Sequence, residues 1–255
     1  MDKTSYSQHG YTLQKNIFTD EELIPIRQIL HMFHMQWLEE NQEFYKSHAI
    51  NSAYITETGK LSSEYRLQLF NFITNKKIIN TISDTVASGL VFVGTQLFFD
   101  PYNQNQKNYW HRDIQYNNLS IQQQKAALCE QNAIHIRIPL KDENGIELIP
   151  GTHKRWDNNE EYSVRLEANG MANDHDLQGG QKIPLQVGDM LIFSANMIHR
   201  GLYGKDRFAF DILFSDPNPD ILKHLPDNCL PTPRELEGIG NPEIYQQAIS
   251  VKHNS

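Results

Sequence analysis

Residues 133–140 read Ala-Ile-His-Ile-Arg-Ile-Pro-Leu, and this stretch decides the fold class. Isoleucine and polar residues alternate along it, which is the two-residue period of a β-strand with one buried face. One face of the strand carries only isoleucine, whereas the other carries His135 and Arg137. If the isoleucines pack on a core, the two polar side chains should line a cavity inside a filled sandwich.

Several other segments have the composition and period of strands. We predict strands over residues 11–18, 90–99, 185–193 and 207–215. Asn144-Gly145 predicts a hairpin turn, and the Ile-Pro-Gly-Thr-His stretch at 149–153 predicts a second turn. Short strands separated by such turns are typical of a sandwich, barrel or jelly roll.

The N-terminal part of the chain has helical periodicity instead. Thr19-Asp-Glu-Glu22 has the form of a capping box, and apolar residues follow at helical spacing as far as Trp37. Further helices are predicted over residues 63–73, 76–87 and 120–130, with one short helix near 241–250. Helices followed by many short strands indicate an α+β chain with a mainly β core.

The length of 255 residues fits a single large β domain. We expect residues 1–89 to form a helical support and residues 90–215 to form the jelly-roll core. Residues 154–182 are polar and rich in turn formers, so they are predicted to be a surface insertion or lid. Residues 216–255 are predicted to be an extended C-terminal tail that wraps the body.

Composition excludes several classes of partner. The formal net charge of −8 argues against nucleic acid, which requires a basic face. No apolar run approaches membrane-spanning length, and we see no signal-peptide core. The two cysteines are far apart, so neither a disulfide framework nor a zinc motif is suggested. We therefore expect a cytoplasmic protein that acts on a small molecule.

Two motifs carry potential metal ligands. Residues 110–113 read Trp-His-Arg-Asp, and residues 197–201 read Met-Ile-His-Arg-Gly. His111, Asp113 and His199 form the two-histidine, one-carboxylate set of non-heme iron(II) oxygenases, which leaves half of an octahedron open. On a strand, the side chains of positions 111 and 113 would share one face. A chain with eleven histidines can also contain an unrelated His-x-Asp triplet by chance.

Arg207 opens a second alternating strand, residues 207–214. Its guanidinium is planar and always charged, which suits two-pronged capture of a carboxylate. Asp211 shares the face of Arg207, and Trp110 and Tyr116 flank the potential metal ligands. The alternatives are a surface salt bridge for Arg207 and ordinary core packing for the two aromatic residues.

These motifs together resemble the phytanoyl-CoA dioxygenase family of iron(II)/2-oxoglutarate-dependent oxygenases. The match is carried by residues 110–113, 138–154 and 188–201, closed by Arg207, and it spans roughly residues 90–215. The resemblance implies a double-stranded β-helix (a cupin-like jelly roll) with N-terminal helices packed on the larger sheet.

The resemblance also implies roles for individual residues. His111, Asp113 and His199 would bind Fe(2+), and Arg207 would pair with the distal carboxylate of 2-oxoglutarate. Gln96 is similar to a polar residue that touches the co-substrate in relatives. The chain departs from the family at Arg137, where relatives often have an aromatic residue. It departs again at Gly201, where they frequently have a serine that assists the arginine.

The expected activity is hydroxylation of a small polar metabolite, amino-acid-like or a natural-product intermediate, with O2 consumed and succinate and CO2 released. The residues expected to line the substrate pocket are His135, Asp211, Tyr116 and Trp110, and Arg137 could contact either the substrate or 2-oxoglutarate. One alternative is an oxygenase for a lipid or acyl substrate. The other is a metal-binding jelly roll without oxygenase activity, either a sensor or a cupin-like isomerase or hydrolase.

Overall fold

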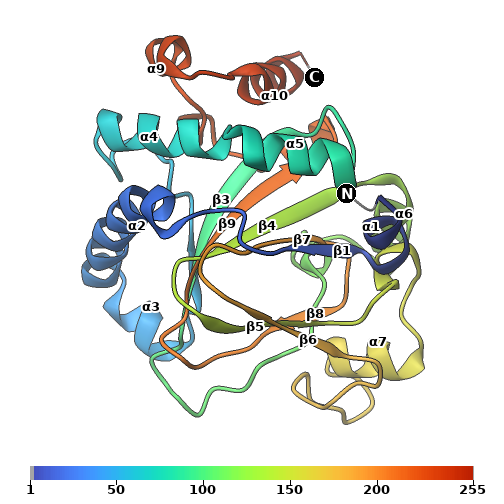
Figure 1. Ribbon diagram of the computed structural model, residues 1–255. Helices are drawn as coiled ribbons and strands as arrows, with labels where there is room; N and C mark the ends of the chain where they lie inside the picture. Colours follow the sequence, from blue (N-terminus) through green and yellow to red (C-terminus); the bar gives the residue numbers. More distant parts are fainter. Residues whose placement is uncertain (1–2, 255) are drawn as a thin grey trace.

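The chain folds into two antiparallel sheets with helices on the outer side of the larger one (Figure 1). The computed structural model describes residues 3–254. The larger sheet has the strand order β1 (Tyr11–Gln14), β7 (Met190–Ser194), β4 (Ala133–Pro139), β9 (Phe208–Ser215), β3 (Val91–Phe99), β2 (Asn51–Ala53). The smaller sheet has the order β6 (Gln181–Leu185), β5 (Glu143–Leu148), β8 (His199–Gly201). This architecture is the predicted double-stranded β-helix.

The larger sheet carries helices because its outer face is apolar. The isoleucines of β4 and the phenylalanines of β9 share one buried core with α2 (Asp20–Glu40), α4 (Ser63–Ile73), α5 (Lys76–Thr85) and α10 (Glu243–His253). Helix α2 begins at the predicted capping box. The apolar residues that alternate along β4 and β9 therefore face the helices, as predicted. The polar side chains between them point to the inner face of the sheet.

Asn144-Gly145 does not form the predicted hairpin turn. Both residues lie within β5, where the register against β6 shifts between Glu143 and Ile146. Gly145 has a φ of 81°, and a Cβ there would collide with the carbonyl oxygen of Ile183. The pair therefore forms a β-bulge. Sequence alone did not separate the two structures because both use a glycine with positive φ.

Part of the predicted insertion at 154–182 is packed into the body. It contains α7 (Asn159–Arg165), and the side chain of its Asp157 is fully buried. Asp157 accepts from Arg112 at 2.8 Å and from Arg165 at 2.6 Å. Since Arg112 lies between His111 and Asp113, this ion cluster ties the segment to the metal motif. Around Asp157, the segment therefore supports the His111–Asp113 motif, because Asp157 binds both Arg165 of the segment and Arg112 of the motif.

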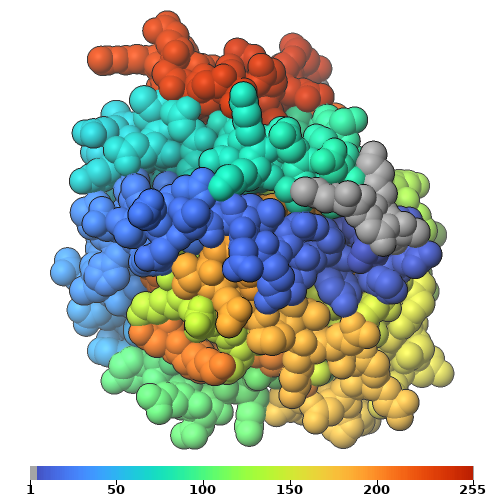
Figure 2. Space-filling view, in the orientation of Figure 1, coloured from blue at the N-terminus to red at the C-terminus, as the bar shows by residue number. Residues whose placement is uncertain are grey.

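The C-terminal segment is more helical than predicted. Residues 216–254 form α8 (Pro219–Leu222), the 3-10 turn η3 (Asp227–Cys229), α9 (Pro233–Gly238) and α10. Pro219 and Pro233 stand in the first turns of their helices, where proline is tolerated, so they do not break helical structure. Tyr245 of α10 is fully buried, and its hydroxyl donates to the Phe70 carbonyl at 3.0 Å. Figure 2 shows this segment lying directly on α4 and α5.

Shorter elements complete the described chain. They are the helices α1 (Lys3–His9), α3 (Gln42–Ser47) and α6 (Ile121–Glu130), and the 3-10 turns η1 (Asp113–Tyr116) and η2 (Thr152–Lys154). Within residues 3–254, none of the helices combines the length and the apolar character needed to cross a bilayer.

Candidate metal centre and co-substrate pocket

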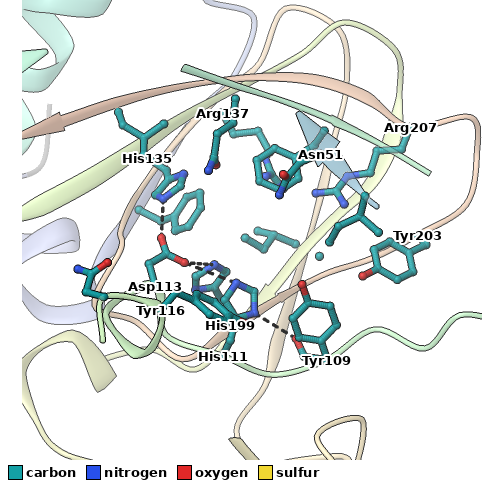
Figure 3. A pocket seen from close by; sticks show the side chains of 18 of the residues that line it. Asn51, Tyr109, His111, Asp113, Tyr116, His135, Arg137, His199, Tyr203 and Arg207 are labelled. Carbon is teal, nitrogen blue, oxygen red and sulfur yellow. Dashed lines mark hydrogen bonds and ion pairs between the residues drawn. The ribbon is translucent and has the colours of Figure 1, made fainter. Parts of the chain in front are cut away.

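The two sheets enclose a cavity of about 430 Å³ (Figure 3). Strand β4 of the larger sheet supplies His135 and Arg137 to its wall, and β8 of the smaller sheet supplies His199. The inner face of β4 thus lines a cavity, as its alternation predicts. Polar side chains from distant parts of the chain meet in this space.

His111, Asp113 and His199 stand together at one wall of the cavity. His111 and His199 form an antiparallel bridge in which each backbone N–H donates to the other residue's carbonyl, at 2.9 and 3.0 Å. The Oδ1 atom of Asp113 lies 3.5 Å from His111 Nε2 and 3.6 Å from His199 Nε2. One ligand atom from each residue falls within 4.8 Å of the others. The bridge thus joins two candidate ligands that are far apart in sequence.

The prediction that one strand presents both His111 and Asp113 is wrong. His111 makes only the single bridge, and Asp113 opens the 3-10 turn η1. The chain turns there because the Gln115 N–H donates to the Arg112 carbonyl, while the Gln115 side chain accepts from the Arg112 N–H. The turn still brings the Asp113 carboxylate beside the imidazole of His111.

Both ligand imidazoles are oriented by backbone carbonyls. His111 Nδ1 lies 3.2 Å from the Tyr109 carbonyl oxygen, and His199 Nδ1 lies 3.0 Å from that of Met197. Because Nδ1–H donates to the carbonyl oxygen, each Nε2 carries no proton, and its free lone pair faces Asp113. Burial lowers the pKa of His111 and lowers that of His199 to about 3. Both rings are therefore neutral, which is the form that binds a metal.

His135 lies between two carboxylates. Its Nε2 is 2.6 Å from Asp113 Oδ2, and its Nδ1 is 3.2 Å from Asp211 Oδ2. Burial opposes protonation of His135, but the carboxylates of Asp113 and Asp211 outweigh it and raise the pKa of His135 to about 9. The ring is therefore protonated at neutral pH and donates from both nitrogens.

Arg207 lies across the cavity from Asp113 (Figure 3). Its Nε donates to Glu143 Oε2 at 3.3 Å, and the two side chains are 1% and 0% exposed. Among residues 3–254, neither Nη1 nor Nη2 has a hydrogen-bond partner. Burying these two charged donors without an acceptor is costly, so the Nη1 and Nη2 edge is suited to a carboxylate that enters the cavity.

Gly201 of β8 lies directly against this guanidinium. A Cβ at Gly201 would be 2.7 Å from Arg207 Nη1 and 3.1 Å from Nη2. With a side chain at this position the guanidinium would have to shift, so in its observed place Arg207 occupies space that the Cβ of a serine would need.

The other predicted site residues divide into two groups. Gln96, Tyr116, His135 and Arg137 line the cavity. Asp211 does not line it, because the residue is fully buried behind Arg137, which donates to it at 2.8 and 2.9 Å. Its assignment to the substrate pocket is corrected accordingly. Arg137 uses Nε and Nη2 in this pair, and its Nη1 has no partner among residues 3–254.

Trp110 is also corrected as a pocket residue. It is fully buried in a separate apolar cluster with Ile149 and Ile198, and the guanidinium of Arg200 lies 4.4 Å from its ring centroid. Trp110 precedes His111 in an extended segment, so their side chains point to opposite sides. The same alternation that brings His111 into the cavity directs Trp110 away from it.

Sequence reasoning missed Glu143, the buried partner of Arg207, and several residues that line the cavity. Glu143 was hidden by the supposed hairpin turn beside it. Phe98 and Tyr109 could have been found, because each is two residues from a predicted site residue on an extended segment. The Phe98 ring lies 4.3 Å from Arg137 Cζ and 5.0 Å from Arg207 Cζ. Asn51 and Tyr203 line the cavity from distant segments and have no local signal.

The cavity fits iron(II) and 2-oxoglutarate on two independent observations. The first is the donor set, in which two neutral imidazole nitrogens and one carboxylate oxygen converge from one side and leave the cavity side open. The second is the pair of unpartnered Arg207 nitrogens, which require an acceptor with two oxygens. A dicarboxylate that also binds the metal meets both requirements.

Comparison with protein families identifies the class. The model described as phytanoyl-CoA dioxygenase (PhyH) matches residues 6–203, a range that includes all three potential ligands. The chain therefore belongs to the phytanoyl-CoA dioxygenase family. It is a non-heme iron(II)- and 2-oxoglutarate-dependent dioxygenase, which confirms the predicted class of enzyme and its cofactors. A search of curated proteins finds no match.

Solved structures share the fold at low identity. AviO1 from Streptomyces viridochromogenes Tue57 is 14% identical with a TM-score of 0.57, and the alignment covers 84% of this chain and 93% of AviO1. EctD from S. alaskensis with bound Fe is 12% identical with a TM-score of 0.56, covering 84% and 75%. The carbocyclase SnoK from nogalamycin biosynthesis is 16% identical with a TM-score of 0.56, covering 85% and 83%.

Proposed function

We propose that His111, Asp113 and His199 hold the iron, that Arg207 receives the distal carboxylate of 2-oxoglutarate, and that the enzyme oxidises a small, uncharged polar metabolite. One observation carries the assignment of the centre: the donor set lies on one side of the cavity, and on the other side lie Nη1 and Nη2 of Arg207, which have no partner within residues 3–254. In AviO1, EctD and SnoK only the fold is shared, so the substrate is inferred from this cavity alone.

Each part of the cavity then has a defined task. When bound, iron(II) and 2-oxoglutarate supply the activation of dioxygen, with succinate and CO2 released. Arg207 binds and orients the co-substrate, while Glu143 orients Arg207 through Nε. Phe98 and Phe193 contribute apolar surface to the cavity and limit the access of water. The chain thus orients the reactants and excludes competing reactions, which is the usual part of the protein in such chemistry.

The mouth of the cavity supports an uncharged substrate. The charged and titrating side chains of the lining are already assigned: they are the three proposed ligands, His135, Arg137 and Arg207. Asn51, Asn117, Tyr109, Tyr116 and Tyr203 add only neutral donors, acceptors and ring faces. Burial raises the pKa of each of these three tyrosines, so their hydroxyls stay neutral. Such groups fit hydroxyl and carbonyl groups on a ring-shaped molecule.

The pairing of Arg137 with Asp211 removes one argument for an amino-acid-like substrate. Asp211 was expected to line the substrate pocket, and Arg137 was expected to contact either the substrate or 2-oxoglutarate. In the structure they bind each other, and His135 completes the neutralisation of Asp211. A substrate group that needed Asp211, or Nε and Nη2 of Arg137, would therefore have to compete with a buried, two-pronged ion pair, and within residues 3–254 Arg137 Nη1 is the nitrogen of this pair left without a partner.

A screen of matched metabolites tests this substrate class. We expect neutral hydroxylated ring compounds to stimulate succinate release from 2-oxoglutarate, and their carboxylated or phosphorylated counterparts to stimulate it less. Stimulation by charged compounds alone would contradict the neutral-substrate proposal. Absence of iron and 2-oxoglutarate binding would instead contradict the assignment of the centre.

Gly201→Ala should weaken the use of 2-oxoglutarate without unfolding the protein. The added methyl group must displace the Arg207 guanidinium, whose Nη1 would be 2.7 Å away. We expect about a tenfold rise in the 2-oxoglutarate KM, equivalent to about 1.4 kcal/mol of lost binding. The check is the KM measured beside a thermal melt, with Gly240→Ala as a comparison, because Gly240 has no positive φ and its added Cβ would meet only Asn71 Oδ1, at 3.8 Å. An unchanged KM would show that Arg207 does not need its observed position.

A further inference from the structure

The two oxygens of Asp113 face different partners. Oδ1 lies 3.5 and 3.6 Å from the Nε2 atoms of His111 and His199, so it is the oxygen that faces the ligand set. Oδ2 lies 2.6 Å from His135 Nε2. Figure 3 shows His135 on the side of the carboxylate away from the two histidines. One oxygen is therefore available to a metal while the other is occupied by a protein donor.

Asp113 needs such an external contact more than the other two proposed ligands do. It lies on the turn η1 outside the sheets, and its side chain is 31% exposed. Its own backbone N–H donates to the Ala195 carbonyl at 3.2 Å, but this contact does not fix the carboxylate. The two histidines, in contrast, are joined by the backbone bridge and are held by carbonyls at Nδ1.

His135 is itself anchored to a rigid part of the larger sheet. Its ring is stacked on Phe193 with a centroid distance of 4.9 Å and an interplanar angle of 17°. Its Nδ1 reaches Asp211, whose other contacts are the Nε and Nη2 of Arg137. Arg137 and Asp211 are directly paired across β4 and β9. Arg137 of β4 and Asp211 of β9 are thus connected through His135 to the carboxylate of Asp113.

We propose that His135 is a positioning residue that keeps Asp113 a one-oxygen ligand. A carboxylate can bind a cation through one oxygen or through both, and the second oxygen would take a coordination position that 2-oxoglutarate and dioxygen require. By holding Oδ2, His135 prevents this and preserves the open side of the centre. Arg137 then acts through Asp211 and His135. The inference rests on the proposed metal site.

Two amide variants separate this role from general support. His135→Asn retains a short polar group that can reach toward Asp211 but cannot extend to Asp113. His135→Gln places an amide near the Nε2 position and can still donate to Asp113. His135→Phe serves as a second variant, since it keeps the ring stacked on Phe193 and removes both hydrogen bonds. Thermal melts of the metal-free proteins check that each variant folds.

The measurements are the iron(II) dissociation constant, by anaerobic competition with a chelator, and the amount of nitric oxide bound per iron, by electron paramagnetic resonance. Nitric oxide is added to the protein saturated with iron(II) and 2-oxoglutarate, so that it probes the one position left for dioxygen. We expect His135→Asn and His135→Phe to weaken iron binding by about 10–100-fold, as for outer partners of metal ligands. Both should bind less nitric oxide per iron, and His135→Gln should restore most of each value.

Several results would overturn the inference. They are an unchanged dissociation constant or nitric oxide capacity in both His135→Asn and His135→Phe, or a His135→Gln protein that behaves like His135→Asn. Failure of the unsubstituted protein to bind iron(II) at all would instead refute the proposed metal site. The two failures are therefore distinguishable.

Discussion

Arg207→Ala is expected to raise the 2-oxoglutarate KM by roughly 30-fold to a few thousand-fold. Truncation of one partner in a buried charge pair costs about 2–5 kcal/mol, and each ~1.4 kcal/mol is a factor of ten. The side chain is 1% exposed, and within residues 3–254 its Nη1 and Nη2 have no hydrogen-bond partner, so both nitrogens are free to bind the carboxylate. The measurement is succinate release as a function of 2-oxoglutarate concentration, beside equilibrium binding of 2-oxoglutarate to the iron-loaded protein.

Two further variants sharpen this experiment. Arg207→Lys keeps the positive charge but loses the two-pronged donor, so its KM should lie between those of the wild type and Arg207→Ala. Arg234→Ala removes an exposed arginine on α9 and should leave the KM unchanged. If Arg207→Ala leaves the 2-oxoglutarate requirement unchanged, the carboxylate partner lies elsewhere. Arg137, whose Nη1 is unpartnered, would then be tested next.

Asp113→Ala is expected to abolish turnover and to weaken iron(II) binding by more than the roughly 10–100-fold typical of outer partners. The substitution removes the single anionic ligand and leaves two neutral imidazoles. It also leaves His135 without its 2.6 Å partner. Iron binding by chelator competition and succinate release measured on the same preparations would check both effects.

Asp84→Ala provides the matched control, because Asp84 is an exposed acid on α5. It should bind iron and release succinate as the wild type does. An Asp113→Ala protein with unchanged iron affinity would refute the proposed ligand set. The family assignment would then require a different set of residues around the same cavity.

The fold was largely predictable because local periodicity determines which face of a strand is apolar. The isoleucines of β4 and the phenylalanines of β9 do face the helices, and α2 does begin at its capping box. Errors arose where one local pattern fits two structures. Asn144-Gly145 serves a bulge as well as a turn, and the prolines of the C-terminal segment begin helices instead of preventing them.

The sequence predicted which residues would form the candidate site, but it did not predict all of their contacts and orientations. Spacing placed His135, Arg137 and Arg207 toward the interior, and the cavity contains all three. Spacing did not reveal that Asp113 leaves the strand for a turn, or that Trp110 faces a separate cluster. Those outcomes depend on hydrogen bonds and packing with segments far away in the chain.

Arg137 and Arg207 separate what the sequence determines from what the tertiary structure decides. By itself, the sequence determined that the side chains of Arg137, in β4, and Arg207, directly before β9, point inward, because side chains alternate along an extended chain. Only the tertiary structure decided which guanidinium has nitrogens to offer a co-substrate. Register across β4 and β9 pairs Arg137 with Asp211 through two hydrogen bonds, whereas Arg207 meets Glu143 through Nε alone. Register is a property of paired strands, and no single strand encodes it.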